Sequence, residues 1–264
     1  MIAYADMQRN VIAVLFFLVS LMTTSCNKFT NGEPTTEYRD VNQPFTVVSM
    51  FNNVNVKLVH DRHPRLELTC PKNLIEKVTT EVNNDTLVIR NENTFNWMRS
   101  FEYSIDLIVY YDSLRSVNYY SIGQLLATDS LVGMKTQVVD TEEKANDSIK
   151  KGNFILRILE GSGDIDLTFN CNILKTVFNN GTSTVTLRGR AGYTEHYMKS
   201  YGAVHAETMY CNIVKVMSHS TNDIYVWPHS ELYASLYNIG NAYYRGDPQV
   251  EATCTSYGRS IPLE

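Results

Sequence analysis

The stretch LEGSGDIDLTFNCNILKTVF, Leu159–Phe178, decides the fold. It opens with the small residues Gly161–Asp164, which suit a tight corner because glycine adopts a positive φ without strain. From Ile165 onward apolar and polar residues alternate, which is the period of a β-strand with one buried face. Its second half, CNILKTV, returns two units later as CNIVKVM, starting at Cys211. The stretch is therefore one unit of a repeat.

The repeat extends over most of the chain, because an apolar residue follows each corner at a nearly constant spacing. A period of roughly 20 residues is typical of a solenoid, in which each coil buries its apolar face by stacking on its neighbours. We expect an all-β solenoid with coils of about 20 residues and one short helix near the N-terminal side, within Cys70–Val82. The aligned residues are Ile165, Val185, Val204, Ile224 and Ala242, with weaker copies at Leu125 and Ser260.

The residue after each aligned position should point outward, because successive side chains of a strand alternate between its two faces. In three consecutive coils this outward residue is His205, Tyr225 or Tyr243. Exposed aromatic side chains on stacked strands can pack against sugar rings. The same three side chains also suit a ladder of ring contacts that stabilises the sheet. We predict them as surface-binding residues, with the ladder as the alternative.

The cysteines follow the same repeat. Cys171 and Cys211 occupy one slot two coils apart, on the order of 9–10 Å at the usual strand spacing. That distance exceeds the limit of roughly 7 Å for a disulfide. We therefore expect both to be small core residues, and we expect the same of Cys254, which falls in the slot of Phe178.

The N-terminus indicates export. The apolar run Val11–Met22 is too short for a transmembrane helix, which needs about 20 residues, and fits the core of a secretory signal peptide. TTSC, Thr23–Cys26, resembles a bacterial lipoprotein signal, in which the cysteine is lipidated and holds the protein on a membrane. Cleavage near Ser25, which would give a soluble exported protein, is the alternative. We also expect translation to start at Met7.

These features divide the chain. We expect a lipoprotein signal peptide at 1–25, a polar tether at 26–40 and a single solenoid domain at 41–264. The segment at about 140–153, DTEEKANDSIKKGN, is charged and poor in apolar residues. We expect it to form a long hairpin loop that interrupts the solenoid.

The sequence contains no recognisable catalytic or cofactor-binding motif. The net charge of −5 argues against a nucleic-acid partner, which would select a basic surface. Asp164 and Asp166 share a strand face and would suit a glycan-cleaving enzyme, although no other charged group is expected beside them. His60 and His63 lie three residues apart without further ligands, so we expect no metal site. We predict no catalytic residue and no cofactor.

Several segments together resemble the putative auto-transporter adhesin, head GIN domain family. They are FTVVSMFNNVNVKLVH, NLIEKVTTEVNNDTLVIRN, LEGSGDIDL and the closing coils NIGNAYYRGDPQVEATCTSYGRSI. The likeness covers about residues 40–262. It implies a right-handed β-helix-like architecture, export and often a lipid anchor, and no established activity.

We therefore expect a non-enzymatic, lipid-anchored protein of the cell envelope, in the outer membrane, whose solenoid presents a surface for adhesion or for binding a glycan or protein. Its partners would be the membrane, through lipid on Cys26, and that ligand. A scaffold facing the periplasm is the alternative, and a glycan-active enzyme is a third. The sequence does not decide which leaflet carries the lipid.

Overall fold

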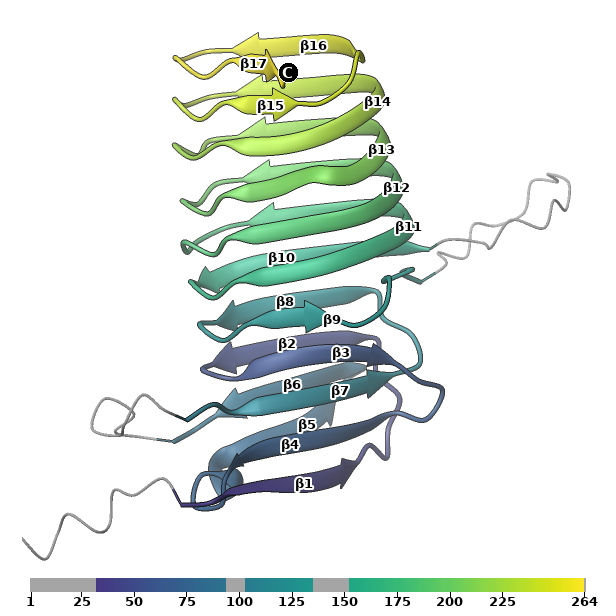
Figure 1. Ribbon diagram of the computed structural model, residues 1–264, viewed down its shortest axis with the longest axis vertical. Helices are drawn as coiled ribbons and strands as arrows, with labels where there is room; N and C mark the ends of the chain where they lie inside the picture. The colour runs from purple at the N-terminus through teal and green to yellow at the C-terminus, as the bar shows by residue number, and fades with distance from the viewer. Residues whose placement is uncertain (1–31, 94–102, 135–151, 264) are drawn as a thin grey trace, which may run out of the picture.

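The computed structural model describes residues 32–93, 103–134 and 152–263. These residues form 17 strands of one strongly curled sheet, and the single helical element among them is the 3₁₀ turn η2 (Ile75–Lys77). The strands stack as rungs along the long axis, from the N-terminal strands at one end to the C-terminal strands at the other (Figure 1). The predicted all-β class is confirmed.

The strands pair in two rows that share four long, bent strands. Pairing is parallel except for β1–β4, β4–β7 and β5–β6. The first row runs β1 (Pro34–Asp40), β4 (Arg65–Pro71), β7 (Asp106–Tyr111), β3 (Asn55–His60), β9 (Leu125–Ala127), β11 (Ile165–Phe178), β12 (Val185–Met198), β13 (Val204–Ser218), β14 (Ile224–Leu236), β15 (Ala242–Tyr244), β17 (Ser260–Pro262). The second runs β5 (Val78–Asn83), β6 (Thr86–Asn91), β2 (Val47–Asn52), β8 (Ser116–Ser121), β10 (Asn153–Gly161), then β11 to β14 again and β16 (Gln249–Cys254).

The register of the parallel pairs agrees with the repeat in the sequence. Each aligned apolar residue lies opposite the next: Leu125, Ile165, Val185, Val204, Ile224, Ala242 and Ser260. The structure confirms this alignment, which was predicted from the spacing. The physical reason is that corresponding apolar residues of successive strands all face the core only when the strands stack in register.

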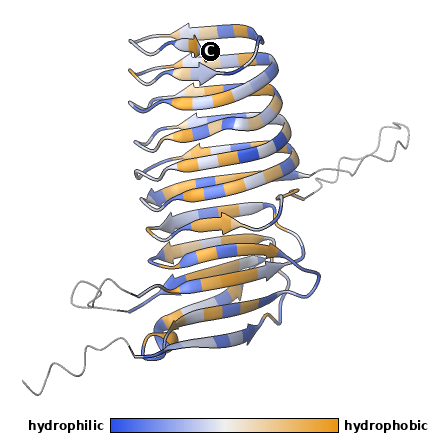
Figure 2. Cartoon of the chain, viewed as in Figure 1, coloured by the Kyte–Doolittle hydropathy of each residue, from blue (hydrophilic) through white to orange (hydrophobic). Residues whose placement is uncertain are grey.

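The core is a column of apolar side chains between the two rows. The strands alternate between hydrophobic and hydrophilic residues along their length (Figure 2). Ile165, Leu167 and Phe169 of β11 are almost completely buried, whereas Asp166 and Thr168 between them are not. Burial of apolar surface contributes about 25 cal/mol per Å² to the stability of the fold. Because every strand of the stack adds to this buried surface, it is the main stabilising contribution.

The predicted corner is present at Gly161, whose φ is +134°. A Cβ atom at this position would collide with the backbone carbonyl of Ser121 on the preceding rung. Glycine is therefore required both for its backbone conformation and for the close approach of two rungs. Asn84 and Asp85, with φ of 47° and 66°, join β5 to β6 in a tight hairpin.

The predicted short helix within Cys70–Val82 is wrong. Only Ile75–Lys77 is helical, as a single 3₁₀ turn in which the Lys77 amide donates to the Leu74 carbonyl. Leu74, Ile75 and Val78 are buried, but they close the end of the core instead of forming one face of a helix. The β-branched residues from Val78 onward favour a strand, and β5 begins there.

The predicted tether at 26–40 is too long. Pro34–Asp40 forms β1, which pairs with β4 over its whole length. Every residue of β1 is exposed or only half-buried, so the strand carries no alternation of apolar residues and its sequence reads as a linker. The signal peptide, Met7, Cys26 and the tether up to residue 31 lie outside the described residues, as does the predicted loop except its last two residues.

The structure tests the cysteine assignments. Cys171 lies opposite Ala191, which lies opposite Cys211, and both cysteines are buried as predicted. Cys254 occupies the slot of Phe178 but is exposed, so its predicted burial is wrong. The reason is its place on β16, the last strand of its row, where no further rung covers it.

Candidate functional site: an aromatic face on the first row

His205, Tyr225 and Tyr243 project from β13, β14 and β15 and stack directly on one another. The ring centroids of His205 and Tyr225 lie 5.1 Å apart with an interplanar angle of 7°. Those of Tyr225 and Tyr243 lie 5.0 Å apart at 10°. All three side chains are half-buried. The structure therefore brings the three predicted site residues together as an aromatic ladder.

The ladder limits how a ligand can contact it. Both faces of the Tyr225 ring are covered by its neighbours, so a sugar ring cannot stack on it as we had considered. The ring edges remain, with the phenol groups of Tyr225 and Tyr243 and the His205 imidazole. Burial, followed by the nearby Asp223 carboxylate, raises the pKa of Tyr225. Its phenol is therefore protonated at neutral pH and can both donate and accept hydrogen bonds.

A second aromatic cluster lies beside the ladder and was missed in the sequence. Tyr210 pairs with Trp227, two residues beyond Tyr225 on the same outer face, with ring centroids 5.4 Å apart and nearly perpendicular rings. The Tyr210 ring also lies 5.2 Å from that of His229. Register shifts in the pairing of β13 with its neighbours bring Tyr210 into this position, and the spacing of the repeat gives no signal for them.

Two arginines flank this cluster. The Arg190 guanidinium lies 5.8 Å from the centroid of the Tyr210 ring, and that of Arg245 lies 4.6 Å from the centroid of the Trp227 ring. Both arginines are exposed, and neither forms an ion pair within the part of the chain that the structure describes. The ladder and this cluster together form one surface, which we name the aromatic face (Arg190, His205, Tyr210, Tyr225, Trp227, His229, Tyr243, Arg245).

The carboxylates considered for glycan cleavage are not arranged as a catalytic pair. Asp166 forms an ion pair with Arg188 of the next rung. The expectation that no charged group lies beside Asp164 and Asp166 is therefore wrong. Arg188 lies opposite Thr168, two residues beyond Thr186, which is the direct partner of Asp166.

The two histidines considered for metal lie at the end of β3 and beyond it. The His60 ring contacts that of Tyr111 edge to face, and the exposed His63 imidazole lies 3.6 Å from the Asp61 carboxylate. Within the described residues, no three histidine, cysteine, aspartate or glutamate side chains gather in a group that could hold a metal ion.

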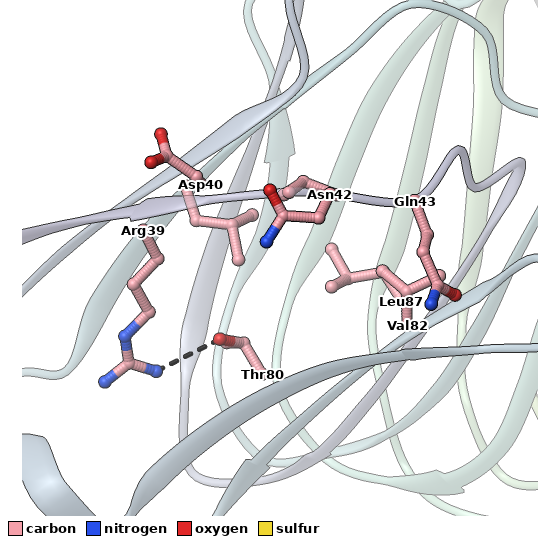
Figure 3. A pocket seen from close by; sticks show the side chains of 9 residues that line it. Arg39, Asp40, Asn42, Gln43, Thr80, Val82 and Leu87 are labelled. Carbon is pink, nitrogen blue, oxygen red and sulfur yellow. Dashed lines mark hydrogen bonds between the residues drawn. The ribbon is translucent and has the colours of Figure 1, made fainter.

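A cavity of about 260 Å³ opens at the N-terminal end, between β1 and the β5–β6 hairpin (Figure 3). Arg39 reaches from β1 to the second row, where its Nη1 donates to the Val78 carbonyl at 2.6 Å and to the Thr80 hydroxyl at 3.1 Å. Its Nη2 donates to the Ile75 carbonyl at 3.3 Å. These contacts make Arg39 a clamp between the two rows. The cavity is lined by Arg39, Asp40, Val41, Asn42, Gln43, Leu66, Thr80, Val82 and Leu87.

A histidine lies inside the core, beneath the aromatic face, and lines a small void with Trp227. His196 of β12 is 1% exposed, and its Nδ1 lies 2.7 Å from the Thr176 hydroxyl. Burial lowers the pKa of His196 to about 4, so the imidazole is neutral at physiological pH. We regard it as a structural residue, because it is enclosed by the core and its Nδ1 is within hydrogen-bond distance of the Thr176 hydroxyl.

The chain belongs to the putative auto-transporter adhesin, head GIN domain family, whose sequence profile matches residues 44–248. This confirms the resemblance found in the sequence. No curated protein matches the chain. In the part of the chain that the structure describes, no helix is long and apolar enough to cross a membrane.

Solved structures share the fold at low sequence identity. A putative adhesin from Bacteroides fragilis NCTC 9343 is 17% identical with a TM-score of 0.71, covering 88% of this chain and 97% of its own. A putative lipid binding protein from Parabacteroides distasonis ATCC 8503 is 15% identical with a TM-score of 0.63, covering 89% and 98%. A putative adhesin from Parabacteroides merdae ATCC 43184 is 14% identical with a TM-score of 0.59, covering 89% and 98%.

Proposed function

We propose that this chain is a non-enzymatic adhesin of the cell envelope that binds glycan through the aromatic face. The observation that carries the proposal is the alignment of Tyr225, Tyr243 and His205 with the neighbouring Trp227 cluster on one outer face. The stacked rings hold their polar edges in a fixed row, which suits a ligand with many hydroxyl groups. Family membership and the neighbouring putative adhesins support a role in adhesion.

The flanking arginines favour an acidic glycan. Arg190 and Arg245 present guanidinium groups at either side of Trp227 and Tyr210. Guanidinium groups recognise carboxylates, and sulfates of similar shape, through paired hydrogen bonds. A polysaccharide with uronic acid or sulfated sugars would therefore satisfy both the hydroxyl row and the two charges.

We further propose that the rungs are the coils of a right-handed β-solenoid, with about 20 residues in each coil. The parallel register supports this architecture, because it joins the aligned residues rung by rung from Ile165 to Ala242. A rigid stack would hold the aromatic face in one orientation over several strands, which suits a binding surface.

The envelope location rests on the N-terminal sequence. We propose a signal peptide at 1–25 and a lipid on Cys26, which would anchor the protein in the outer membrane. Mass analysis of the mature N-terminus tests the anchor, and an unmodified residue other than Cys26 would overturn it. Protease treatment of intact cells separates the adhesin from the alternative, a scaffold facing the periplasm. Digestion supports exposure outside, and full protection supports the scaffold.

Glycan binding is tested with the double variant Tyr225→Phe and Tyr243→Phe. It removes two hydroxyl groups and keeps the stacked rings, so folding should be unchanged. We expect at least a tenfold loss of affinity for an array of acidic and neutral polysaccharides. Tyr233→Phe, on the second row, is the matched control and should bind as the wild type does. Absence of binding to every polysaccharide, or equal binding by the double variant, would refute the assignment.

A further inference from the structure

The last strand of the second row, β16, exposes side chains whose counterparts are buried in the preceding rungs. Val250 is 37% exposed, whereas Leu232 below it is 0% exposed. Ala252 and Cys254 are exposed as well, although Ala234 and Leu236 in the same slots are buried. The inward-facing, mostly apolar residues of β16 therefore form an uncovered end of the core.

The backbone of β16 is also unpaired on one side. In the described residues β16 pairs with β14 alone. The inward-facing residues Ser218 of β13 and Leu236 of β14 show the hydrogen-bonding pattern. The Ser218 carbonyl accepts from the Tyr237 amide, and the Leu236 carbonyl accepts from the Thr255 amide, so each carbonyl points toward the strand that follows in the stack. By the same pattern Val250 and its inward-facing neighbours on β16 direct their N–H and C=O groups toward the free edge. Such an edge is a template for another strand.

We propose that two copies of this chain join through their β16 edges, which pair antiparallel about a twofold axis at Ala252. Val250 then lies opposite the partner's Cys254, and Ala252 lies opposite the partner's Ala252. In each pair the inward-facing side chains of one copy continue the core of the other. The exposure of Cys254 is explained, because its cover comes from the second copy.

Charge selects this register. In an antiparallel pair two opposed residues either both direct their backbone groups across the junction or both direct them away from it, so the axis must coincide with a single residue. An axis at Glu251 would place this carboxylate opposite the partner's Glu251, which is destabilising. An axis at Thr253 would leave Val250 beyond the paired strand. With the axis at Ala252, Glu251 faces the partner's Thr253 and the whole exposed apolar row is covered.

The N-terminal end does not offer the same surface. There the free edges belong to β1 and β5, and Arg39 ties the two rows together across the end of the core. The residues of β1 are largely polar and include Glu37, Arg39 and Asp40. Two equivalent C-terminal ends therefore fit one another better than a C-terminal end fits an N-terminal end, and the twofold contact closes the assembly at two copies.

The contact should be modest in strength. A six-residue strand extends about 20 Å at the usual rise of about 3.3 Å per residue, and pairing at one end covers less surface than the roughly 1,600 Å² of an ordinary interface. We expect a dimer that dissociates on dilution, with a dissociation constant on the order of micromolar.

The test uses the mature chain in a mild detergent, because the proposed lipid on Cys26 would otherwise hold it on a membrane. Sedimentation equilibrium should give a monomer–dimer equilibrium for the wild type. Ala252→Lys places a charge on the axis beside its symmetry copy and should give a monomer with an unchanged circular dichroism spectrum. Val250→Cys, treated with a mild oxidant, should form a disulfide with the partner's Cys254, because opposed Cα atoms of such a pair lie about 5.5 Å apart.

Two controls define the register. Val250→Cys combined with Cys254→Ser should give no covalent dimer. Glu251→Cys combined with Cys254→Ser should also give none, whereas an axis at Glu251 would make this variant crosslink. A wild type that stays monomeric at all accessible concentrations would overturn the proposal. So would a dimer that Ala252→Lys leaves intact, or one in which Val250→Cys does not crosslink to Cys254.

Discussion

Acidification should destabilise this protein through His196. The imidazole is enclosed in the core and its Nδ1 meets the Thr176 hydroxyl, so the folded state has no place for a second proton. Burial is the main cause of the lowered pKa, and the Glu195 carboxylate opposes it weakly from the same strand. In the unfolded chain the imidazole regains its ordinary pKa of about 6.5.

The direction and size of the effect follow from these two pKa values. Because the folded pKa lies below the unfolded one, the unfolded chain takes up the proton first as the pH falls. The stability contributed by neutral His196 is complete above about pH 6.5 and declines until the pH reaches about 4. The two pKa values differ by about 2.5 units and each unit corresponds to about 1.4 kcal/mol, so the total loss approaches about 3.5 kcal/mol. About 2.5 kcal/mol of it should have disappeared at pH 4.5.

Urea unfolding at a series of pH values measures this loss. His196→Asn provides the comparison, because its amide can replace Nδ1 at the Thr176 hydroxyl but does not titrate. Carboxylates such as Glu195 contribute equally to both proteins and cancel in the difference. The free energy of unfolding of the wild type should fall by about 2.5 kcal/mol more than that of the variant between pH 7.5 and pH 4.5. Parallel pH profiles, or an NMR titration of folded His196 near pH 6.5, would refute the reasoning.

Three further predictions concern the stability of the folded chain. Arg39→Ala should lower the free energy of unfolding by about 2–3 kcal/mol, because three hydrogen bonds across the N-terminal end are lost. Urea titration measures this loss, and an unchanged midpoint would contradict the role of Arg39 as a clamp. Tyr225→Ala removes two ring contacts and Tyr243→Ala one, at about 0.5–1.5 kcal/mol each, so the first should lower Tm more. The reverse order would contradict the ladder. Gly161→Ala should destabilise by several kcal/mol, since its Cβ meets the Ser121 carbonyl; an expression level and a Tm equal to the wild type would count against the corner.

The repeat made the register predictable because stacked parallel strands must bury side chains in the same slots. Ile165, Val185, Val204 and Ile224 occupy one such slot regardless of their exact neighbours. The corner at Gly161 was predictable for a similar reason, since its backbone conformation excludes most other residues. A structural feature can therefore be predicted from a single sequence when it repeats along the chain or when only one residue type can adopt its backbone conformation.

Features at the two ends of the stack could not be predicted from the sequence, because the strands there lack a neighbour on one side and do not keep the hydrophobic pattern of the repeat. β1 pairs through its backbone while its side chains remain largely in solvent, so its sequence carries no hydrophobic period. Leu74 and Ile75 occupy helical spacing but close the core from one end, where a turn suffices. Cys254 has the slot of a core residue and lacks the rung that would bury it.

The candidate site was predictable in its position but not in its chemistry. The repeat placed His205, Tyr225 and Tyr243 on one outward column, and the structure confirms their contact. The spacing of the repeat does not show that His205 and Tyr243 cover both faces of the Tyr225 ring, which leaves only the edge of that ring and its hydroxyl group for a ligand. The adjoining Trp227 and Tyr210 depend on register shifts, which change the spacing locally. Candidate binding residues of a repeat protein should therefore be sought where the repeat departs from its period, because side chains at such positions are not determined by the stacking of the strands alone.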